Sequence, residues 1–315
     1  MKPITSYTKK LENGQPQRLR EVLSTKAAFK QESAPPYAAF AMSGPQVKVV
    51  MYESGKLVVQ GKGVEEFVTF ILEPDVLEKA EFGYELELEP EQLDPRIGVD
   101  ESGKGDFFGP LCVAAVYVNE MGVRALDAAG VQDSKNIGSD KRIRDLAGFI
   151  RSSKGVVVEE LVIGCEAYNR LYSKMKNVNK LLAWGHAKAI ENLLERSMAL
   201  DPAPVRAVCD QFARSEARLK SAMLEKGRQL ELVQRHKAES DMAVAAASIM
   251  ARERFVNGLE RLSGRFELDL PKGASGKVDQ AALRFLEKHG KEALHSVGKL
   301  HFKTAERAIA IAEGN

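Results

Sequence analysis

An acidic, proline-containing block divides this chain and constrains its fold more than any other feature. Residues 61–94 carry 11 acidic and 2 basic side chains, whereas residues 1–60 carry 4 acidic and 9 basic ones. Pro74, Pro90 and Pro95 lie in or beside the block. A solvated linker or domain edge is the usual structure for such a run. The pattern predicts two folding units, residues 1–80 and 95–315, joined by an acidic linker at residues 81–94.

The overall composition is typical of a soluble globular protein. Hydrophobic residues make up 44% of the chain, charged residues 29%, and the formal net charge is +2. These values exclude disordered, fibrous and strongly basic proteins. The sequence has no uninterrupted apolar run near 18 residues and no apolar core for a secretory signal at its start. Its three cysteines are far apart and fit neither a disulfide framework nor a zinc site. We therefore expect a cytoplasmic protein with no membrane partner.

Residues 1–80 show the pattern of a small α+β domain. The β-rich runs at residues 47–53 and 56–60 are separated by Ser54 and Gly55, which is a tight hairpin signal. Apolar residues recur at helical spacing around Leu19 and again over residues 64–71. A helix, strands and a second helix predict one sheet that is covered on one face.

Three side chains surround the predicted hairpin: Tyr52, Lys56 and Lys62. An aromatic and cationic face of this kind could contact a nucleic-acid backbone. An ordinary solvent-exposed face with lysines is an equally good interpretation of the same spacing. The positive charge of residues 1–60 modestly favours binding, and we expect their loss to weaken substrate affinity more than turnover.

The second unit has the pattern of a mixed α/β sheet flanked by helices. Apolar or β-branched runs predict strands at residues 111–118, 156–163, 205–209 and 230–233. Helical periodicity predicts an early helix opened by Ser139 or Asp140 and an apolar stripe over residues 181–194. An Ala-rich helix is expected over residues 239–262, followed by amphipathic helices at 278–288 and 304–312.

Within this unit, residues 98–111 (GVDESGKGDFFGPL) join acids and glycines directly to an apolar run. The first seven residues fit the P-loop spacing G-x-x-x-x-G-K. However, Gly105 stands where that motif has its magnesium-binding hydroxyl, and two acids inside the loop would repel phosphates. The three glycines at 103, 105 and 109 are spaced one residue too widely for a dinucleotide fingerprint. The segment therefore argues against both nucleotide-binding motifs.

Asp100 and Glu101 are candidate metal ligands, because Mg²⁺ prefers hard oxygen donors. Neighbouring residues of a strand point to opposite faces, so both acids can serve one site only where the strand ends or bends. The glycine turn (Gly103, Lys104 and Gly105) permits such a bend and offers N–H groups and an ammonium to a phosphate. Two adjacent acids alone are usually only solvated.

Two further carboxylates supply what such a site needs. Asp210 directly follows an apolar strand, at the end where open α/β sheets commonly build sites. Glu239 lies at the expected start of the Ala-rich helix, where an acid can also simply stabilise the helix dipole. Each acid alone has an ordinary structural explanation. Together, the four carboxylates fit a two-metal site that activates water and stabilises the leaving oxygen of a phosphodiester.

Other polar residues are left outside this set. Asp106 and Asp241 lie close to the nominated acids but are not assigned to the metals. The five histidines are scattered without the spacing of zinc ligands, and His186 and His289 are expected to be structural or surface groups.

These motifs together resemble one family. The run of residues 100–106 with Gly109 and Pro110, then residues 133–135, Asp210 and residues 237–239 leading into 244–249 resemble the type 2 ribonucleases H. Within that family they are most similar to the bacterial ribonuclease HIII branch. Lys104 stands where the sister ribonuclease HII usually has Arg, and Glu239 stands where that sister usually has Asp. The resemblance covers essentially the whole chain.

The resemblance implies an RNase H-like α/β catalytic domain, preceded by a small α+β, TBP-like domain that binds substrate. It implies endonucleolytic hydrolysis of the RNA strand of an RNA/DNA hybrid with Mg²⁺ or Mn²⁺, giving 5′-phosphate and 3′-hydroxyl ends. Asp100, Glu101, Asp210 and Glu239 would be the catalytic, metal-binding carboxylates. Substrate contacts would come from Gly103, Lys104, Gly105, Ser134, Lys135 and Lys272.

We expect a monomer without an obligate protein partner. Two alternative functions stay open on the residues alone. One is a non-catalytic nucleic-acid-binding protein, and the less favoured one is a P-loop-like nucleotide hydrolase.

Overall fold

The structure is a computed structural model that describes residues 4–79, 90–210, 217–235 and 238–313. The chain divides into two compact units, Met1–Pro90 and Glu91–Asn315. Most of the predicted acidic linker, residues 81–89, lies outside the described residues. Residues 91–94 are grouped with the second unit, where the Arg206 guanidinium lies 3.5 Å from the Asp94 carboxylate. The bounds of the linker stay a prediction.

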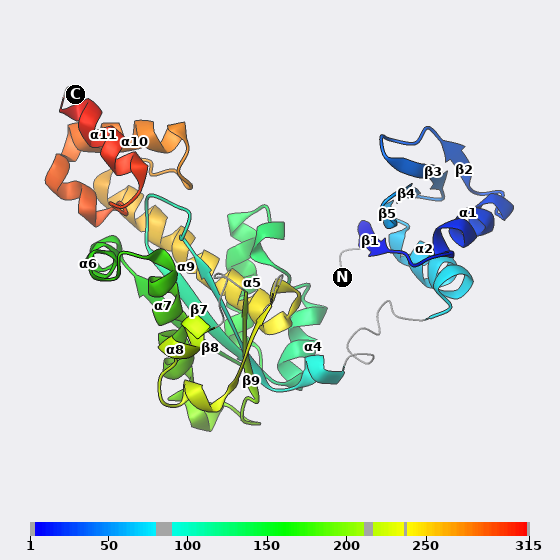
Figure 1. The fold of residues 1–315 in the computed structure, drawn as a ribbon, viewed down its shortest axis with the longest axis horizontal. Coiled ribbons are helices and arrows are strands. Elements are labelled where there is room, and N and C mark those ends of the chain that lie inside the picture. The colour runs from blue at the N-terminus through cyan, green and yellow to red at the C-terminus, as the bar shows by residue number, and fades with distance from the viewer. Residues whose placement is uncertain (1–3, 80–89, 211–216, 236–237, 314–315) are drawn as a thin grey trace. The chain divides into compact units, whose positions relative to one another are not determined.

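The first unit is an antiparallel sheet packed against helices (Figure 1). Its strand order is β1-β5-β4-β3-β2, and the predicted hairpin is confirmed as β4 and β5. Strand β1 is polar and half-exposed, β2 is polar and fully exposed, and β3 is rich in Ala, which explains why alternation of apolar residues did not indicate these strands. The strands are β1 (Ser6–Lys10), β2 (Lys30–Glu32), β3 (Ala38–Gly44), β4 (Val47–Tyr52) and β5 (Lys56–Gln60).

One apolar core holds this unit together. The helix α1 (Gln15–Thr25) contributes Leu19 and Leu23 to it. The short α2 (Val64–Phe67) continues into a π-helix, η1 (Val68–Leu77), which contributes Leu72 and Val76. The same core contains inward-facing residues of β3, β4 and β5. The expected α+β domain, with one sheet face covered by helices, is therefore confirmed.

The second unit is built on a mixed sheet with the strand order β10-β9-β6-β7-β8. The central β6 pairs antiparallel with β7 and parallel with β9, and β10 in turn runs parallel to β9. All eight residues of β7 are buried, so this strand is covered on both faces. The strands are β6 (Arg96–Ser102), β7 (Leu111–Val118), β8 (Val156–Ile163), β9 (Arg206–Asp210) and β10 (Glu231–Arg235).

Helices cover both faces of this sheet (Figure 1). On one face, α7 (Val178–Leu194) packs Ala187, Ile190 and Leu193 against residues of β6 and β7, with α6 (Cys165–Met175) and α8 (Ala217–Ala222) beside it. On the other face lie α9 (Met242–Phe266), α5 (Asp140–Ser152) and α4 (Glu120–Ala128). The helices α10 (Gly276–His289) and α11 (Lys303–Ala312) pack on the C-terminal half of α9. No helix in the described ranges is long and apolar enough to cross a bilayer.

The Ala-rich helix begins later than predicted. Helix α9 starts at Met242, because the Asp241 side chain accepts a hydrogen bond from Ala243 N at 2.9 Å and caps the helix. Glu239 lies before the cap, in the short 3₁₀ helix η6 (Ala238–Ser240). The interpretation of Glu239 as the residue that opens this helix was therefore wrong.

All three cysteines are buried and unpaired, and all three lie in the second unit. Burial raises the pKa of Cys112 to about 12, that of Cys165 to about 11 and that of Cys209 to about 12. The thiols therefore stay protonated at neutral pH. The expectation that they form no disulfide framework is confirmed.

Candidate active site

The two adjacent acids lie where β6 emerges from the core. Residues Arg96 to Val99 of this strand are buried, whereas Asp100, Glu101 and Ser102 are half-buried. Strand alternation places Glu101 on the same face as Val99, which packs in the core on the α7 side. Asp100 then lies on the face of Gly98, which packs against α9. The two carboxylates therefore meet at the end of the strand from opposite faces.

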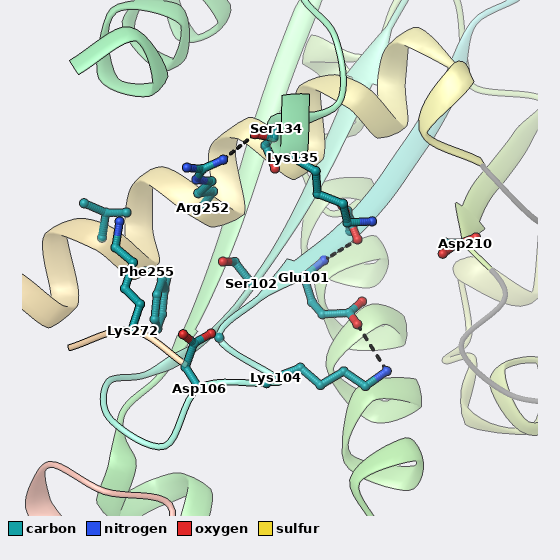
Figure 2. Close-up of a pocket in the computed structure, with 14 residues that line it drawn as sticks. Glu101, Ser102, Lys104, Asp106, Ser134, Lys135, Asp210, Arg252, Phe255 and Lys272 are labelled. Carbon is teal, nitrogen blue, oxygen red and sulfur yellow. Dashed lines mark hydrogen bonds and ion pairs between the residues drawn. The ribbon is translucent and has the colours of Figure 1, made fainter. Parts of the chain in front are cut away.

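Glu101 is held by two cationic or donor groups. His186 Nε2 on α7 lies 2.9 Å from one carboxylate oxygen. Lys104 Nζ lies 3.7 Å from the other, and Figure 2 marks this ion pair. Burial raises the pKa of Glu101, but the hydrogen bond and charge of His186 and the charges of Lys104 and Lys135 together hold it below its ordinary value. The carboxylate is therefore ionised at neutral pH and His186 Nε2–H donates to it.

Asp100 has the opposite electrostatic environment. Burial and the neighbouring charge of Glu101 raise the pKa of Asp100 well above its ordinary value, although a hydrogen bond from Glu101 N at 2.8 Å and the charge of Lys135 oppose the shift. Two crowded carboxylates whose pKa values are driven apart are typical of a functional site.

Asp210 lies beside this pair on the neighbouring strand. Strands β6 and β9 run parallel with Val99 opposite Cys209, so Asp100 and Asp210 each follow one residue later at the same end of the sheet. Parallel strands end at one edge, and the glycine turn leaves β6 at that edge too. The structure therefore brings Asp210 to the edge that carries Asp100 and Glu101.

The short helix η6, which contains Glu239, packs beside β9, where its Ala238 shares a small apolar cluster with Val208; the Glu239 side chain lies outside the described part of the structure. A Cβ on Gly98 would lie 2.1 Å from the Ala243 carbonyl carbon, so only glycine lets the first turn of α9 rest on β6. The Asp241 carboxylate also accepts a hydrogen bond from the buried Arg96 guanidinium at 2.7 Å. These contacts fix the segment that follows Glu239 against β6.

The glycine turn (residues 103–105) has one position where only glycine fits and one open position. Gly103 has φ +91°, and a Cβ there would lie 2.2 Å from the Pro110 carbonyl oxygen. Nothing lies within 4 Å of a Cβ placed on Gly105, so this side of the turn is open. The turn leads from β6 into the antiparallel strand β7 and not into a helix. That context excludes the P-loop alternative, which needs a strand, loop and helix.

A cleft of about 620 Å³ joins these groups. Figure 2 shows Glu101 between the side chains of α9 on one side and Asp210 on the other. Nine of the ten residues nominated from sequence line this cleft, and Glu239 is the exception because its side chain is not described. The nine are Asp100, Glu101, Gly103, Lys104, Gly105, Ser134, Lys135, Asp210 and Lys272.

One wall of the cleft carries cationic side chains, and these bond to other groups of the second unit. Ser134 N donates to Ser248 Oγ at 3.0 Å, and the Arg252 guanidinium donates to the Ser134 carbonyl oxygen. Lys272 Nζ lies 2.7 Å from the Asp140 carboxylate. The loop of Ser134 and Lys135 is therefore fastened to α9, and Lys272 is fastened to the start of α5.

Sequence reasoning missed two residues of this region. His186 was expected to be a structural or surface group; it is not a surface group, because it is only 1% exposed, and its contact with Glu101 was not foreseen. Its position on the apolar stripe of α7, four residues after Leu182 and four before Ile190, was the available signal, since a buried imidazole needs a polar partner. Arg252 gave no comparable signal, because its partner Ser134 is 118 residues away.

The described residues do not by themselves form a complete metal site. No group of three or more His, Cys, Asp or Glu side chains among them is arranged to hold one ion. The donors at the sheet edge are nevertheless carboxylate oxygens, which Mg²⁺ and Mn²⁺ prefer. A divalent cation would also favour the ionised form of Asp100, whose pKa is raised by burial and by the charge of Glu101.

Comparison with known families matches both units. Residues 97–305 match the family described as Ribonuclease HII, and residues 9–81 match a domain of unknown function, DUF3378. Ribonuclease HIII of Protochlamydia amoebophila is 45% identical over 276 residues, which are 87% of this chain and 88% of that protein. Ribonuclease HIII of Chlamydia trachomatis serovar L2 is 46% identical over 279 residues, 88% of this chain and 89% of that protein.

A solved structure is similar over nearly the full length. The crystal structure of Bst-RNase HIII in complex with Mn²⁺ superposes with a TM-score of 0.66 at 31% identity, covering 99% of this chain and 100% of that chain.

Proposed function

The chain belongs to the ribonuclease HIII family of ribonucleases H, and on that premise we propose that it cuts the RNA strand of RNA/DNA hybrids at internal positions. Cleavage leaves 5′-phosphate and 3′-hydroxyl ends. The observation that carries this proposal is the single cleft that joins Asp100, Glu101 and Asp210 to the glycine turn. The family relationship makes the protein an endoribonuclease; the residue roles given below are part of the proposal.

Asp100, Glu101, Asp210 and Glu239 would hold Mg²⁺ or Mn²⁺. Bst-RNase HIII, with which the chain shares its fold, was crystallised with Mn²⁺. The crowded, half-buried pair of Asp100 and Glu101 fits such an ion, because a cation favours the ionised form of a carboxylate whose pKa burial has raised. When bound, two ions would activate the attacking water and stabilise the leaving 3′-oxygen.

The protein's own groups orient this carboxylate set. His186 and Lys104 each contact one oxygen of Glu101, which limits rotation of the carboxylate and keeps it ionised. The Asp100 carboxylate accepts a hydrogen bond from Glu101 N, which limits rotation about its own side chain. Such fixed orientation lowers the reorganisation needed when substrate binds.

The glycine turn supplies a means to select RNA. The 2′-hydroxyl distinguishes RNA from DNA at each nucleotide, and backbone amides can approach it only where side chains are absent. Gly105 has open space where a side chain would stand, and Lys104 is 39% exposed at the cleft. Ser134, Lys135 and Lys272 line the same cleft and would contact the phosphate backbone. Sequence-independent cleavage follows from contacts of this kind.

The first unit would add substrate affinity. Lys56 and Lys62 are exposed and Tyr52 is half-exposed beside the confirmed hairpin of β4 and β5. Cations and an aromatic ring on a sheet suit a nucleic-acid backbone without sequence preference.

A cleavage assay tests this function. A hybrid with a labelled RNA strand, an RNA duplex and a DNA duplex are each incubated with Mg²⁺, Mn²⁺ or a chelator. We expect cutting of the hybrid alone, only with metal, and products that carry a 5′-phosphate. Asp100→Asn should abolish cutting while the protein still shifts the hybrid in a gel. Retention of the hybrid by wild-type protein without any product would instead indicate a non-catalytic binding protein.

A further inference from the structure

The loop between β6 and β7 has two halves with different environments. The glycine turn (residues 103–105) faces the cleft and is open around Gly105. The anchored half (residues 106–109) is bonded on several sides, and its Phe107 and Phe108 are fully buried. The open half can hold a fixed conformation for substrate only if the anchored half is itself fixed.

Lys299 is the side chain that ties the anchored half down. Its Nζ donates to the carbonyl oxygens of Asp106 at 2.8 Å and Gly109 at 2.6 Å, the first and last residues of that half. Its backbone N donates to the Phe107 carbonyl oxygen at 2.9 Å. The side chain is completely buried, so these contacts are shielded from water.

A buried ammonium is an expensive way to hold two carbonyl groups. Burial lowers the pKa of Lys299 to about 8, although the charge of Asp106 opposes the shift. The Asp106 carboxylate is turned to the other side of the loop, where it accepts a hydrogen bond from Gly273 N at 2.6 Å. A buried charge seldom adds to the stability of a fold. It is better explained by a need to hold the loop carbonyl groups in fixed positions.

The segment that carries Lys299 is also anchored. Asn169 on α6 donates to the carbonyl oxygens of His295 and Gly298 and accepts a hydrogen bond from Leu300 N at 2.9 Å. Gly109 N donates to the Val297 carbonyl oxygen at 3.0 Å, and this bond joins the anchor segment (residues 297–300) to the loop between β6 and β7. Helix α6 thus holds the anchor segment, and this segment holds the loop.

We propose that Lys299 is a positioning residue that fixes the glycine turn and thereby sets the affinity for the hybrid. The inference rests on the proposed function of that turn in binding the RNA strand. Lys299 lies 190 residues from Gly109 in sequence and does not itself line the cleft; its hydrogen bonds go to Asp106, Phe107 and Gly109 and not to the proposed metal ligands. Its loss therefore acts on substrate binding, and the chemistry of bound substrate is unchanged.

The test compares Lys299→Met, which keeps the length of the side chain and removes its donors, with Lys303→Met, an exposed lysine on α11. Cleavage of labelled hybrid at saturating Mn²⁺ gives KM and kcat. For Lys299→Met we expect KM to rise about tenfold while kcat stays within about twofold. For Lys303→Met both constants should match those of the wild type.

Asn169→Ala gives a second route that leaves the buried ammonium in place. It removes the side-chain bonds that hold the anchor segment, and we expect KM to rise about threefold at unchanged kcat. This variant carries the test if Lys299→Met does not fold. An unchanged KM in either folded variant, or a fall in kcat at unchanged KM, overturns the proposal.

Failure of the proposed function gives a different result. In that case the wild type leaves the hybrid uncut with both metals, whatever the variants do. Gel-shift titration of the hybrid then replaces KM as the readout. Weaker binding by Lys299→Met than by Lys303→Met supports the positioning role, and equal binding overturns it.

Discussion

The two units differ in where they place their polar side chains. Among the described residues, the first unit buries one charged side chain, Glu73, whereas the second buries ten polar or charged ones. The core of the first unit is apolar, and Lys48 and Lys56 remain at its surface. In the second unit, His186 and Lys299 are fully enclosed near the cleft.

This difference separates two ways in which a domain can act on a substrate. Burying a charge costs free energy unless the charge is paired, so a domain that buries several holds them in fixed positions with shifted pKa values. A domain with solvated charges can attract a polyanion but cannot orient reacting atoms closely. We therefore assign chemistry to the second unit and affinity to the first, and four experiments test this division.

The largest effect should come from the edge of the second sheet. We expect Asp210→Asn to lower kcat at least about 1,000-fold, because a neutral amide holds a divalent cation poorly and such ions contribute several kcal/mol to catalysis. Asp145→Asn, at an exposed acid paired with Lys141 on α5, is the matched control and should keep full activity. Single-turnover cleavage of hybrid measures both. Near-normal kcat for Asp210→Asn would remove it from the site.

The next effect concerns the free energy of unfolding, and it tests the contrast between the buried charge of Lys299 in the second unit and the surface charge of Lys48 in the first. The pKa of Lys299 is about 8 in the folded protein, below its ordinary value of 10.5. Between these pH values the unfolded chain holds a proton that the native state has lost, so native stability rises with pH. Relative to Lys299→Met, the wild type should gain up to about 3 kcal/mol from pH 8 to 10.5.

Urea unfolding across this pH range measures that difference. Lys48→Met in the first unit is the control, because Lys48 forms a surface pair with Glu32 at 2.9 Å. Its stability should follow the wild-type curve. Parallel curves for Lys299→Met and the wild type would mean that Lys299 keeps an ordinary pKa in the fold.

A smaller effect should follow from His186. His186→Leu removes the donor to Glu101, and we expect the Mn²⁺ concentration for half-maximal binding to rise about 10- to 100-fold. His186→Gln keeps an N–H donor and should retain most of the affinity. Titration of Mn²⁺ by electron paramagnetic resonance reads binding directly, without cleavage. Equal Mn²⁺ affinity in the Leu and Gln variants would assign His186 a packing role alone.

The smallest effect belongs to the first unit. We expect the double variant Lys56→Met and Lys62→Met to raise KM about threefold with kcat unchanged. The number of phosphate contacts, read from the salt dependence of hybrid binding, should fall by up to about two. Lys26→Met, at a lysine paired with Asp75, is the control. A large loss of kcat in the double variant would break the division between the two units.

Sequence patterns predicted the elements that bury a continuous apolar surface. Strand β7 and helix α7 followed from apolar runs and helical spacing, because their burial is local to the element. Strands β1 and β2 did not, since their polar residues adopt a strand only by pairing with β5 and β3. Helices α4 and α6 also went unpredicted, although α6 carries the Asn169 that holds the anchor segment.

Within the candidate site, the motif residues could be nominated because they lie on short segments at element ends. Their helpers could not, because they come from distant parts of the chain. His186 meets Glu101 across 85 residues, and Lys299 meets Asp106 across 193. These contacts depend on the packing of α7 and of the anchor segment, and that packing cannot be inferred from a single sequence.

The three buried cysteines can report when the second unit opens. Their thiols are protonated and enclosed in the native state, so a thiol-reactive dye should label them only when the surrounding structure opens. Because none of the three lies in the first unit, the labelling rate follows the second unit alone. A change in that rate on adding hybrid or Mn²⁺ would therefore measure how strongly each ligand holds the second unit closed, without any engineered probe.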